Sequence, residues 1–379
     1  MKLLLIMFGL LSLIIPFKVN AEEYLPNGKS GILIEANSGK ILFEKNKDER
    51  LSIASMTKMV AQIIILEEIE SGNIKWDDIV TVSRNAADMG GSQIYISEGE
   101  KISVEDLMKG ISVASGNDAT VAMAEYISGS EAKFVKRMNK VVKSLGLKNT
   151  NFKNCTGLDE EGHYSSSYDM AMIARELVIK HSEILRFSSI YEDYLRENTK
   201  DKFWLVNTNK LINFYDGADG LKTGHTDNAG YCLSATAKRN NLRLIGIVLG
   251  EENSKVRNSE MINLLDYGFN NTKMNILKKK GSIVQKVKLD KADSKYLNVV
   301  TMDDLGVVEE IGNKNKYKYS VSLDDVSFPI YKGQVVGKID AIYKGKVVSS
   351  TQLISKSDVN KINIFKLIRE NIISFVNGF

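Results

Sequence analysis

The sequence predicts an α/β (α+β) protein in which an antiparallel sheet carries flanking helices and is followed by a small all-β domain and a terminal amphipathic helix. Three observations support this prediction. Pairs of apolar runs typical of β-hairpins occur near both ends of the first 250 residues. Apolar residues at helical spacing fill the interval between these pairs. Beyond about residue 270, short β-branched runs replace the helical pattern.

The first 21 residues have the pattern of a secretory signal. Lys2 precedes an apolar run over residues 3–17, and a short segment ending in Ala21 offers a cleavage site before two glutamates. The apolar run is shorter than the roughly 20 residues that a membrane span needs, and it contains Pro16. We therefore expect a cleaved signal peptide at residues 1–21 and an exported mature protein. An uncleaved membrane anchor is the alternative, and it would also export the rest of the chain.

The sheet is expected from two hairpins that lie far apart in the sequence. Residues 31–43 contain two apolar runs joined by Asn-Ser-Gly-Lys, and residues 231–238 and 242–249 flank a short polar turn. Distant hairpins around a helical interval predict one sheet with helices on its faces, within a single domain at residues 22–275. The segments with helical periodicity are residues 56–70, 104–114, 118–127, 131–145 and 167–179.

The C-terminal part is expected to form two further units. Residues 276–355 contain β-branched runs with polar alternation, which predict a small all-β domain; the runs are residues 282–289, 317–323, 334–343 and 347–354. Residues 356–379 are expected to form an amphipathic membrane-anchoring helix, because residues 361–379 place apolar side chains opposite polar ones at helical spacing. These apolar side chains are Ile364, Phe365, Ile368, Ile372, Phe375, Val376 and Phe379. Docking of this helix on its own domain is the alternative.

Charge and composition exclude several classes of function. The net charge is +4, and loss of Lys2 and Lys18 with the signal lowers it to +2, which is too small and too dispersed to predict a nucleic-acid partner. Two cysteines do not make a disulfide scaffold, and both are expected to be buried small residues. The three histidines show no metal-ligand spacing. We expect no metal and no cofactor.

Three short motifs occur in one order along the chain and point to a serine acyl-transfer site. They are Ser-Met-Thr-Lys at residues 55–58, Ser-Gly-Asn at residues 115–117 and Lys-Thr-Gly at residues 222–224. Each motif also has a decoy in the same chain, at residues 130–133, 83–85 and 29–31. Only the first set keeps the order with room for a helical region between its members. The prediction of a serine acyl-transfer site therefore rests on the order and local context of the three motifs, and not on any single motif.

Ser55 and Lys58 form a candidate nucleophile and base. They are three residues apart, so they lie on the same face of the helix that begins beside them. A serine hydroxyl needs an adjacent base, and a lysine serves as one only if its pKa is lowered. Burial on an apolar helix, the positive end of that helix and a nearby Lys222 would each lower this pKa. By contrast, Ser130 and Lys133 are flanked by charged residues and are expected on a solvated surface.

The other two motifs supply a second hydroxyl and an edge for the substrate. Ser115 lies in a loop between two predicted helices, where its hydroxyl can relay a proton to a leaving amine. Asn117 can hold a peptide carbonyl through its amide. Beside a predicted strand, Lys222 and Thr223 can bind an extended peptide and its terminal carboxylate, and Gly224 permits close approach. Helix capping at the second motif and an ordinary strand-end turn at the third are the alternatives.

With these motifs, the chain resembles the low-molecular-mass penicillin-binding proteins of the D-alanyl-D-alanine carboxypeptidase type, serine peptidase family S11. The motif set is shared with class A β-lactamases. The resemblance covers nearly the whole chain, and its supporting stretches are residues 52–59, 91–93, 112–118, 163–165 and 217–225. It implies a β-lactamase/transpeptidase-like catalytic domain at residues 22–275.

The resemblance also implies roles for single residues. Acylation would occur on Ser55 with Lys58 as the base, and the second and third elements would be Ser115 with Asn117 and Lys222 with Thr223 and Gly224. The backbone N–H groups of Ser55 and His225 would form the oxyanion hole. Arg257 matches a family arginine that helps to recognise the substrate carboxylate through Thr223. The chain departs from the family pattern at Thr208, where relatives can carry arginine, and this changes the substrate contacts expected there.

The implied reaction is removal of the terminal D-alanine from the pentapeptide stem of peptidoglycan, through an acyl-enzyme that water then hydrolyses. β-Lactam antibiotics would acylate the same serine. The implied location is the extracytoplasmic face of the cell membrane, with peripheral attachment through residues 361–379. The alternatives are a class A-like β-lactamase, a transpeptidase or endopeptidase of the same superfamily, and a non-enzymatic wall-binding protein. A β-lactamase is disfavoured because the acidic residues 159–161 lie in a loop that resembles the peptidase family.

Overall fold

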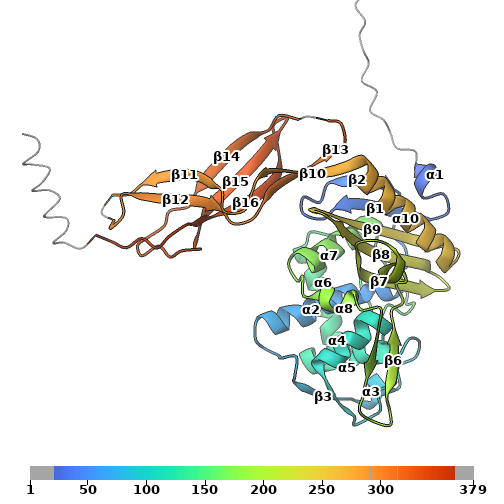
Figure 1. The fold of residues 1–379 in the computed structure, drawn as a ribbon. Helices are drawn as coiled ribbons and strands as arrows, with labels where there is room; N and C mark the ends of the chain where they lie inside the picture. The colour runs from blue at the N-terminus through green and yellow to red at the C-terminus, as the bar shows by residue number, and fades with distance from the viewer. Residues whose placement is uncertain (1–20, 291, 314, 363–379) are drawn as a thin grey trace, which may run out of the picture.

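The computed structural model describes residues 21–290, 292–313 and 315–362 (Figure 1). Nearly all of the predicted signal peptide, and the predicted terminal helix from residue 363 onward, lie outside these described residues. Among the helices of the described ranges, none is both long enough and apolar enough to cross a lipid bilayer.

A five-stranded antiparallel sheet with the order β2-β1-β9-β8-β7 forms the centre of the N-terminal two thirds of the chain. Its strands are β1 (Ser30–Glu35), β2 (Ile41–Lys45), β7 (Ala218–Thr226), β8 (Gly230–Arg239) and β9 (Leu242–Glu251). β1 pairs with β9 in the register that places Ile32 opposite Ile247. The two distant hairpins therefore join in one sheet, as predicted. The Lys-Thr-Gly motif lies within β7, the edge strand that pairs with β8.

Both faces of this sheet are covered, which explains the continuous apolar runs in its central strands. Ile32 and Ile34 of β1 point into the core that the sheet shares with the helical part of the chain. Leu33 points to the other face, into the core shared with α10 (Ser254–Asn271). A Cβ at Gly246 of β9 would lie 2.5 Å from Met261 Sδ of α10, so the helix packs closely on the strand. Figure 1 shows α10 running along the sheet, with the other long helices on the opposite side.

α10 is not predicted from the sequence, and its mixed composition is the physical reason. Its buried face combines Leu264 and Leu265 with the buried polar side chains of Arg257 and Glu260, so no clean apolar stripe is visible in the sequence. Its start does carry a signal, because the Asn253 side chain accepts hydrogen bonds from two backbone N–H groups of the first turn. A capping residue alone is a weak predictor of an 18-residue helix.

The interval between the hairpins is mainly helical. The predicted helix at residues 167–179 is found with both ends unchanged, but the segment at 56–70 begins with the 3₁₀ turn η1, and the segment at 104–114 ends in the π-helical turn η2. Both irregular turns lie at the motif serines, and such turns are common at functional sites. The helical segments are α1 (Ala21–Tyr24), η1 (Ala54–Thr57), α2 (Lys58–Glu70), α3 (Arg84–Ala87), α4 (Val104–Lys109), η2 (Gly110–Ala114), α5 (Asn117–Ser128), α6 (Glu131–Ser144), α7 (Ser167–Ile179), α8 (Ile184–Ser188) and α9 (Leu211–Phe214).

Two short hairpins in this interval are not predicted from the sequence. β3 (Ile79–Thr81) pairs with β4 (Lys101–Ser103), and β5 (Glu192–Leu195) pairs with β6 (Phe203–Val206). Strands of three or four residues are too short to show a reliable alternation of apolar and polar side chains. The second hairpin leads directly into residues 207–209, which include Thr208.

A β-rich part begins directly after α10 and projects away from the sheet (Figure 1). β10 pairs with β13, and the remaining strands form a sheet with the order β11-β12-β16-β15-β14 around a separate core that includes Leu297, Ile339 and Leu353. All four predicted runs are found as strands, and the all-β character is confirmed; β10, β12 and β13 are additional. The strands are β10 (Thr272–Lys278), β11 (Ile283–Lys288), β12 (Tyr296–Thr301), β13 (Leu305–Glu310), β14 (Lys318–Leu323), β15 (Val335–Tyr343) and β16 (Lys346–Ser355).

Candidate active site

The side chain of Lys58 connects the first two motifs. Its Nζ lies 2.7 Å from Ser55 Oγ, 2.6 Å from Asn117 Oδ1 and 2.7 Å from the carbonyl oxygen of Thr156. Lys58 is the first residue of α2 and is completely buried, although the motif predicts only that it shares a face with Ser55. The Thr156 carbonyl is a contact that the sequence analysis missed.

These three contacts suit both forms of the lysine. A protonated Lys58 donates to all three oxygens, whereas a neutral Lys58 gives its two N–H groups to Asn117 Oδ1 and the Thr156 carbonyl and leaves its lone pair for the hydroxyl of Ser55. Burial lowers the pKa of Lys58 to about 7, although the neighbouring Cys155 and Asp118 act in the opposite direction. A buried lysine with a pKa of about 7 is partly neutral near neutral pH, and a neutral amine can accept a proton from a hydroxyl within hydrogen-bond distance.

The turn that carries Ser55 is held by two glycines from other segments. A Cβ at Gly224 of β7 would lie 2.5 Å from the carbonyl oxygen of Ile53. A Cβ at Gly157, whose φ is +87°, would lie 1.9 Å from the carbonyl oxygen of Ala54. Backbone can approach this closely only where no side chain intervenes. The predicted close approach at Gly224 is thus directed at the turn that carries Ser55.

The second motif follows the π-helical turn η2. Ser115 has a left-handed backbone with φ of +64°, which is costly for a residue other than glycine and is tolerated where the surroundings fix it. The Asn117 backbone N–H donates to the Ser92 carbonyl at 2.7 Å, and its Nδ2 donates to the Gly90 carbonyl at 2.7 Å. Both ends of the Asn117 amide are therefore engaged within the protein, one with Lys58 and one with the loop around Gly90.

The third motif brings a second buried lysine to the site. Lys222 of β7 is almost completely buried, and its Nζ donates to the carbonyl of Thr223 at 2.9 Å. Burial lowers the pKa of Lys222 well below its ordinary value, and the charges of Lys58 and Arg257 lower it further. Burial, one of the three causes predicted for the lowered pKa of Lys58, is the one that acts there. Lys222 is not among the causes at Lys58; instead the charge of Lys58 lowers the pKa of Lys222.

The remaining predicted residues lie around this strand. Arg257 in the first turn of α10 is close enough to Lys222 for their charges to interact, and its guanidinium donates to Asn258 Oδ1. The Thr223 hydroxyl donates to Thr208 Oγ1 at 2.7 Å, so Thr208 contacts the third motif directly.

His225 follows Gly224 along β7. Its ring stacks on that of Tyr231, the residue opposite it on β8, with a centroid distance of 4.0 Å. Because the Cβ position of Gly224 is 3.3 Å from the backbone nitrogen of Ser55, this end of β7 adjoins that N–H group.

A buried histidine that was not predicted as part of the site lies beside the turn that carries Ser55. His163 Nδ1 accepts a hydrogen bond from the Lys153 backbone N–H, so Nε2 carries the proton and donates to Thr57 Oγ1 at 2.8 Å. Burial lowers the pKa of His163 to about 4, which keeps the ring neutral. The stretch at residues 163–165 carries the family resemblance, but its contact with Thr57 could not be inferred from spacing.

Two decoy motifs have ordinary structural roles. Ser130 Oγ accepts the backbone N–H of Lys133 and caps α6, and Ser83 Oγ accepts the backbone N–H of Ala86 and caps α3. Serine is a preferred residue at helix N-termini. The same sequence motifs therefore occur in two different environments. At residues 83 and 130 the serines cap helices, whereas the motifs at residues 55–58 and 115–117 are joined through Lys58.

Comparison with known proteins gives a consistent result. Residues 18–253 match the D-alanyl-D-alanine carboxypeptidase family, peptidase S11, and residues 273–361 match the C-terminal domain of penicillin-binding protein 5. The D-alanyl-D-alanine carboxypeptidase DacF of Bacillus subtilis is 47% identical over 350 residues, which cover 92% of this chain and 90% of that protein.

Solved structures show the same likeness. Penicillin-binding protein 5 of Haemophilus influenzae has a TM-score of 0.70 and 34% identity, with coverage of 88% of this chain and 98% of that one. Penicillin-binding protein D2 of Listeria monocytogenes in its ampicillin-bound form has a TM-score of 0.58 and 31% identity, with coverage of 64% and 97%. The predicted resemblance is confirmed, and the chain belongs to the D-alanyl-D-alanine carboxypeptidase family of serine peptidases, S11.

Proposed function

We propose that this D-alanyl-D-alanine carboxypeptidase removes the terminal D-alanine of peptidoglycan pentapeptide stems through an acyl-enzyme on Ser55. The observation that carries the proposal is the contact of the Ser55 hydroxyl with a buried Lys58 whose pKa is lowered to about 7. A neutral amine at that place removes the proton of Ser55 as its Oγ attacks the carbonyl carbon between the two D-alanines. Family membership supplies the substrate class.

The proposed steps conserve protons and bonds. Attack by Ser55 Oγ gives a tetrahedral intermediate, whose oxyanion would accept hydrogen bonds from the backbone N–H groups of Ser55 and His225; one such donor is typically worth about 3 kcal/mol of barrier. The proton taken by Lys58 passes through the Ser115 hydroxyl to the leaving amine, and the C–N bond breaks to release D-alanine. A water molecule then attacks the ester carbon and gives one proton to Lys58. As the bond between Ser55 Oγ and that carbon breaks, Lys58 passes this proton to Ser55 Oγ, and the shortened peptide leaves with a new carboxyl group.

We place the substrate along the free edge of β7. An extended peptide can add to an edge strand by main-chain hydrogen bonds, and β7 is the edge strand that carries Lys222 and Thr223. The terminal carboxylate would be held by the Thr223 hydroxyl, with the charges of Lys222 and Arg257 behind it. Asn117 is engaged with Lys58 and Gly90, which supports a role for it in aligning the base; contact with a substrate carbonyl would require its Nδ2 to leave Gly90.

β-Lactam antibiotics are the second expected ligand class. The ampicillin-bound form of the Listeria monocytogenes relative supports acylation of the same serine by a penicillin. A class A-like β-lactamase differs in the fate of this adduct, because it hydrolyses the penicillin rapidly. A transpeptidase differs in the acceptor, because an amine then replaces water.

The test uses purified protein without its signal, given diacetyl-Lys-D-Ala-D-Ala in one reaction and a penicillin in another. We expect continuous release of D-alanine from the peptide and a long-lived, one-to-one penicillin adduct. Rapid hydrolysis of the penicillin without release of D-alanine would contradict the proposal in favour of a β-lactamase. Addition of an amine acceptor tests the remaining alternative, because a new peptide product would identify a transpeptidase.

We further propose that the enzyme acts outside the cytoplasm, at the membrane surface, as a signal at residues 1–21 and an amphipathic anchor at residues 356–379 would require. The catalytic part would span residues 22–275 and the β-rich part residues 276–355, as a spacer between the site and the membrane. Deletion of residues 361–379 should move the protein from the membrane fraction to the soluble extracytoplasmic fraction of cells. Equal membrane binding of the full-length and shortened proteins would refute the anchor.

A further inference from the structure

The loop before β4 supports the second motif from outside the site. As shown above, carbonyl oxygens of Gly90 and Ser92 accept both backbone and side-chain hydrogen bonds from Asn117, the residue that also contacts Lys58. A Cβ at Gly91 would lie 2.7 Å from Asn117 Nδ2, so the loop is in direct contact with this side chain. The position of residues 90–92 therefore affects the position of Asn117, and contacts that hold this loop in place also affect the site.

One side of the loop is fixed by Asp118, the residue next to Asn117. Its carboxylate is completely buried and accepts the backbone N–H groups of Ile94 at 3.0 Å and Ile96 at 3.3 Å. The same carboxylate accepts the N–H of Ala119 in the first turn of α5 at 2.8 Å. The loop is therefore tied to the helix that begins with the second motif.

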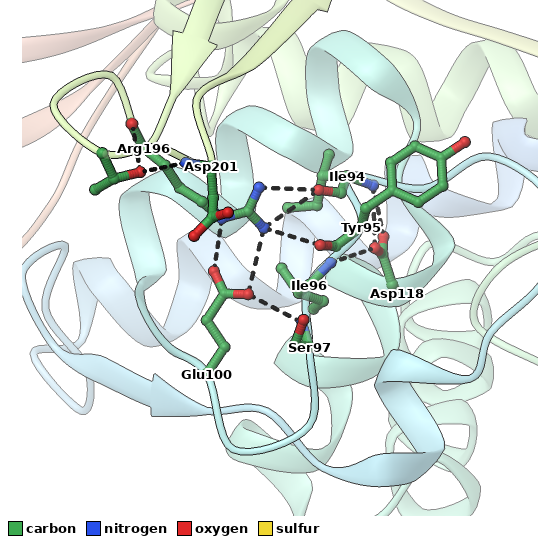
Figure 2. Close-up of polar contacts among 9 residues, drawn as sticks. Ile94, Tyr95, Ile96, Ser97, Glu100, Asp118, Arg196 and Asp201 are labelled. Carbon is green, nitrogen blue, oxygen red and sulfur yellow. Dashed lines mark hydrogen bonds and ion pairs between the residues drawn. The ribbon is translucent and has the colours of Figure 1, made fainter.

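The other side of the loop is fixed by Arg196 at the end of β5. Its guanidinium donates to Glu100 Oε1 at 2.7 Å, to the Ile94 carbonyl at 3.3 Å and to the Tyr95 carbonyl at 3.2 Å. Glu100 in turn accepts the Ser97 backbone N–H at 2.9 Å. Figure 2 shows Arg196 and Asp118 on opposite sides of the backbone at residues 94–96, one holding its carbonyl groups and the other its N–H groups.

The backbone held in this way is strained. Tyr95 has a φ of +55° and Arg196 a φ of +52°, a left-handed conformation that is unfavourable for side chains of this size. The ring of Tyr95 is 65% exposed and meets Phe203 of β6 edge-on at 5.5 Å, so burial of this ring does not account for the strain. Strained residues persist where surrounding contacts over-determine them, and they cluster at functional sites.

We propose that Arg196 is a positioning residue for acylation of Ser55, acting through the loop at residues 90–100. Arg196 donates hydrogen bonds to the carbonyl groups of Ile94 and Tyr95 and to the carboxylate of Glu100, and these contacts keep the loop beside Asp118. The loop in turn keeps Asn117 aligned with Lys58. The inference rests on the proposed function, since it names a residue that acts on the proposed nucleophile and base. It extends the site to the hairpin β5–β6, which touches neither of them in the contacts described above.

The test compares Arg196→Ala with wild type in the rate constant for acylation by a fluorescent penicillin. We expect a loss of about ten- to a hundredfold, because a small displacement of a catalytic group has effects of this size. For the peptide substrate, kcat should fall by a larger factor than KM rises, since Arg196 contacts the loop beside Asn117 directly, whereas in the contacts described above the hairpin reaches Thr223 only through Thr208. Arg196→Lys keeps the charge opposite Glu100 but lacks the planar guanidinium that reaches both carbonyls. Its acylation rate constant should therefore lie between those of wild type and Arg196→Ala.

Arg186→Ala is the matched control. Arg186 also joins two segments through a carboxylate, Glu105 at 3.0 Å, but this ion pair is exposed and is unconnected with the loop at residues 90–100 in the contacts described here. The control should acylate at the wild-type rate. Glu100→Gln should add little to the loss in Arg196→Ala, because both substitutions release the same loop.

Acylation by Arg196→Ala at the wild-type rate would overturn the proposal. So would a loss explained entirely by a lower unfolding midpoint, and if Arg196→Ala does not fold, a wild-type rate in Arg196→Lys would be equally decisive. Failure of the wild-type protein itself to be labelled would refute the proposed function and this inference together. Labelled wild type with an unaffected Arg196→Ala would refute the inference alone.

Discussion

Replacement of Ser55 by alanine is expected to abolish covalent labelling by penicillin and to lower kcat for D-alanine release by on the order of 10⁵-fold or more. The reason is that the proposed acyl-enzyme bond forms on Ser55 Oγ, and an alanine side chain has no atom that can form this bond. Labelling is measured with a fluorescent penicillin after denaturing electrophoresis, and turnover is measured as released D-alanine. The unfolding midpoint should stay close to that of wild type, because the change removes one hydroxyl.

Ser130→Ala is the matched control for this prediction. Ser130 has the same Ser-x-x-Lys spacing as Ser55, but it caps α6 at the protein surface. Its replacement should cost about 1 kcal/mol of stability and leave labelling and turnover intact. Persistent labelling of Ser55→Ala, or loss of labelling in the control, would show that the nucleophile has been misassigned.

The second large effect concerns the charge of Lys58. Because the base must be neutral to accept a proton, kcat/KM should rise with pH, pass its midpoint near the lowered pKa of about 7 and level off above it. Arginine stays protonated throughout this range, so Lys58→Arg should lose about 10²- to 10⁴-fold in acylation rate on the plateau above pH 7, and the difference from wild type should shrink as the pH falls towards 5. The measurement is the pH profile of kcat/KM for D-alanine release between pH 5 and 9.

Lys133→Arg serves as the control, since Lys133 belongs to the decoy motif and its replacement should leave the profile unchanged. A wild-type profile that is flat between pH 6 and 8 would contradict the role of Lys58 as the titrating base. Near-normal activity of Lys58→Arg would contradict it independently of any pKa.

Much of the fold could be predicted because its main determinants are local. The strands at residues 30–35 and 242–251 contain runs without a polar side chain at residues 31–34 and 244–249, and both faces of the sheet are indeed buried. α10 could not be predicted because the buried polar side chains of Arg257 and Glu260 interrupt its apolar face. The helix is therefore stabilised by its packing in the folded protein and not by a local apolar pattern. The hairpin β5–β6 escaped because its strands are only four residues long.

The site divides in a similar way. The motif residues carry their chemistry in their side chains, so Ser55, Lys58 and Lys222 could be proposed from residue type, spacing and context. The carbonyl of Thr156 and the close approach of Gly157 depend on backbone position, and neither leaves a sequence pattern.

Mass-spectrometric mapping of the penicillin adduct locates the covalent bond itself and so decides whether Ser55 is the acylated residue. Wild-type protein is incubated with a penicillin, digested and searched for the modified peptide. We expect one adduct per chain, on Ser55 in the peptide that also contains Lys58. An adduct on Ser115 or on any residue other than Ser55, or no adduct on a folded protein that releases D-alanine, would contradict it.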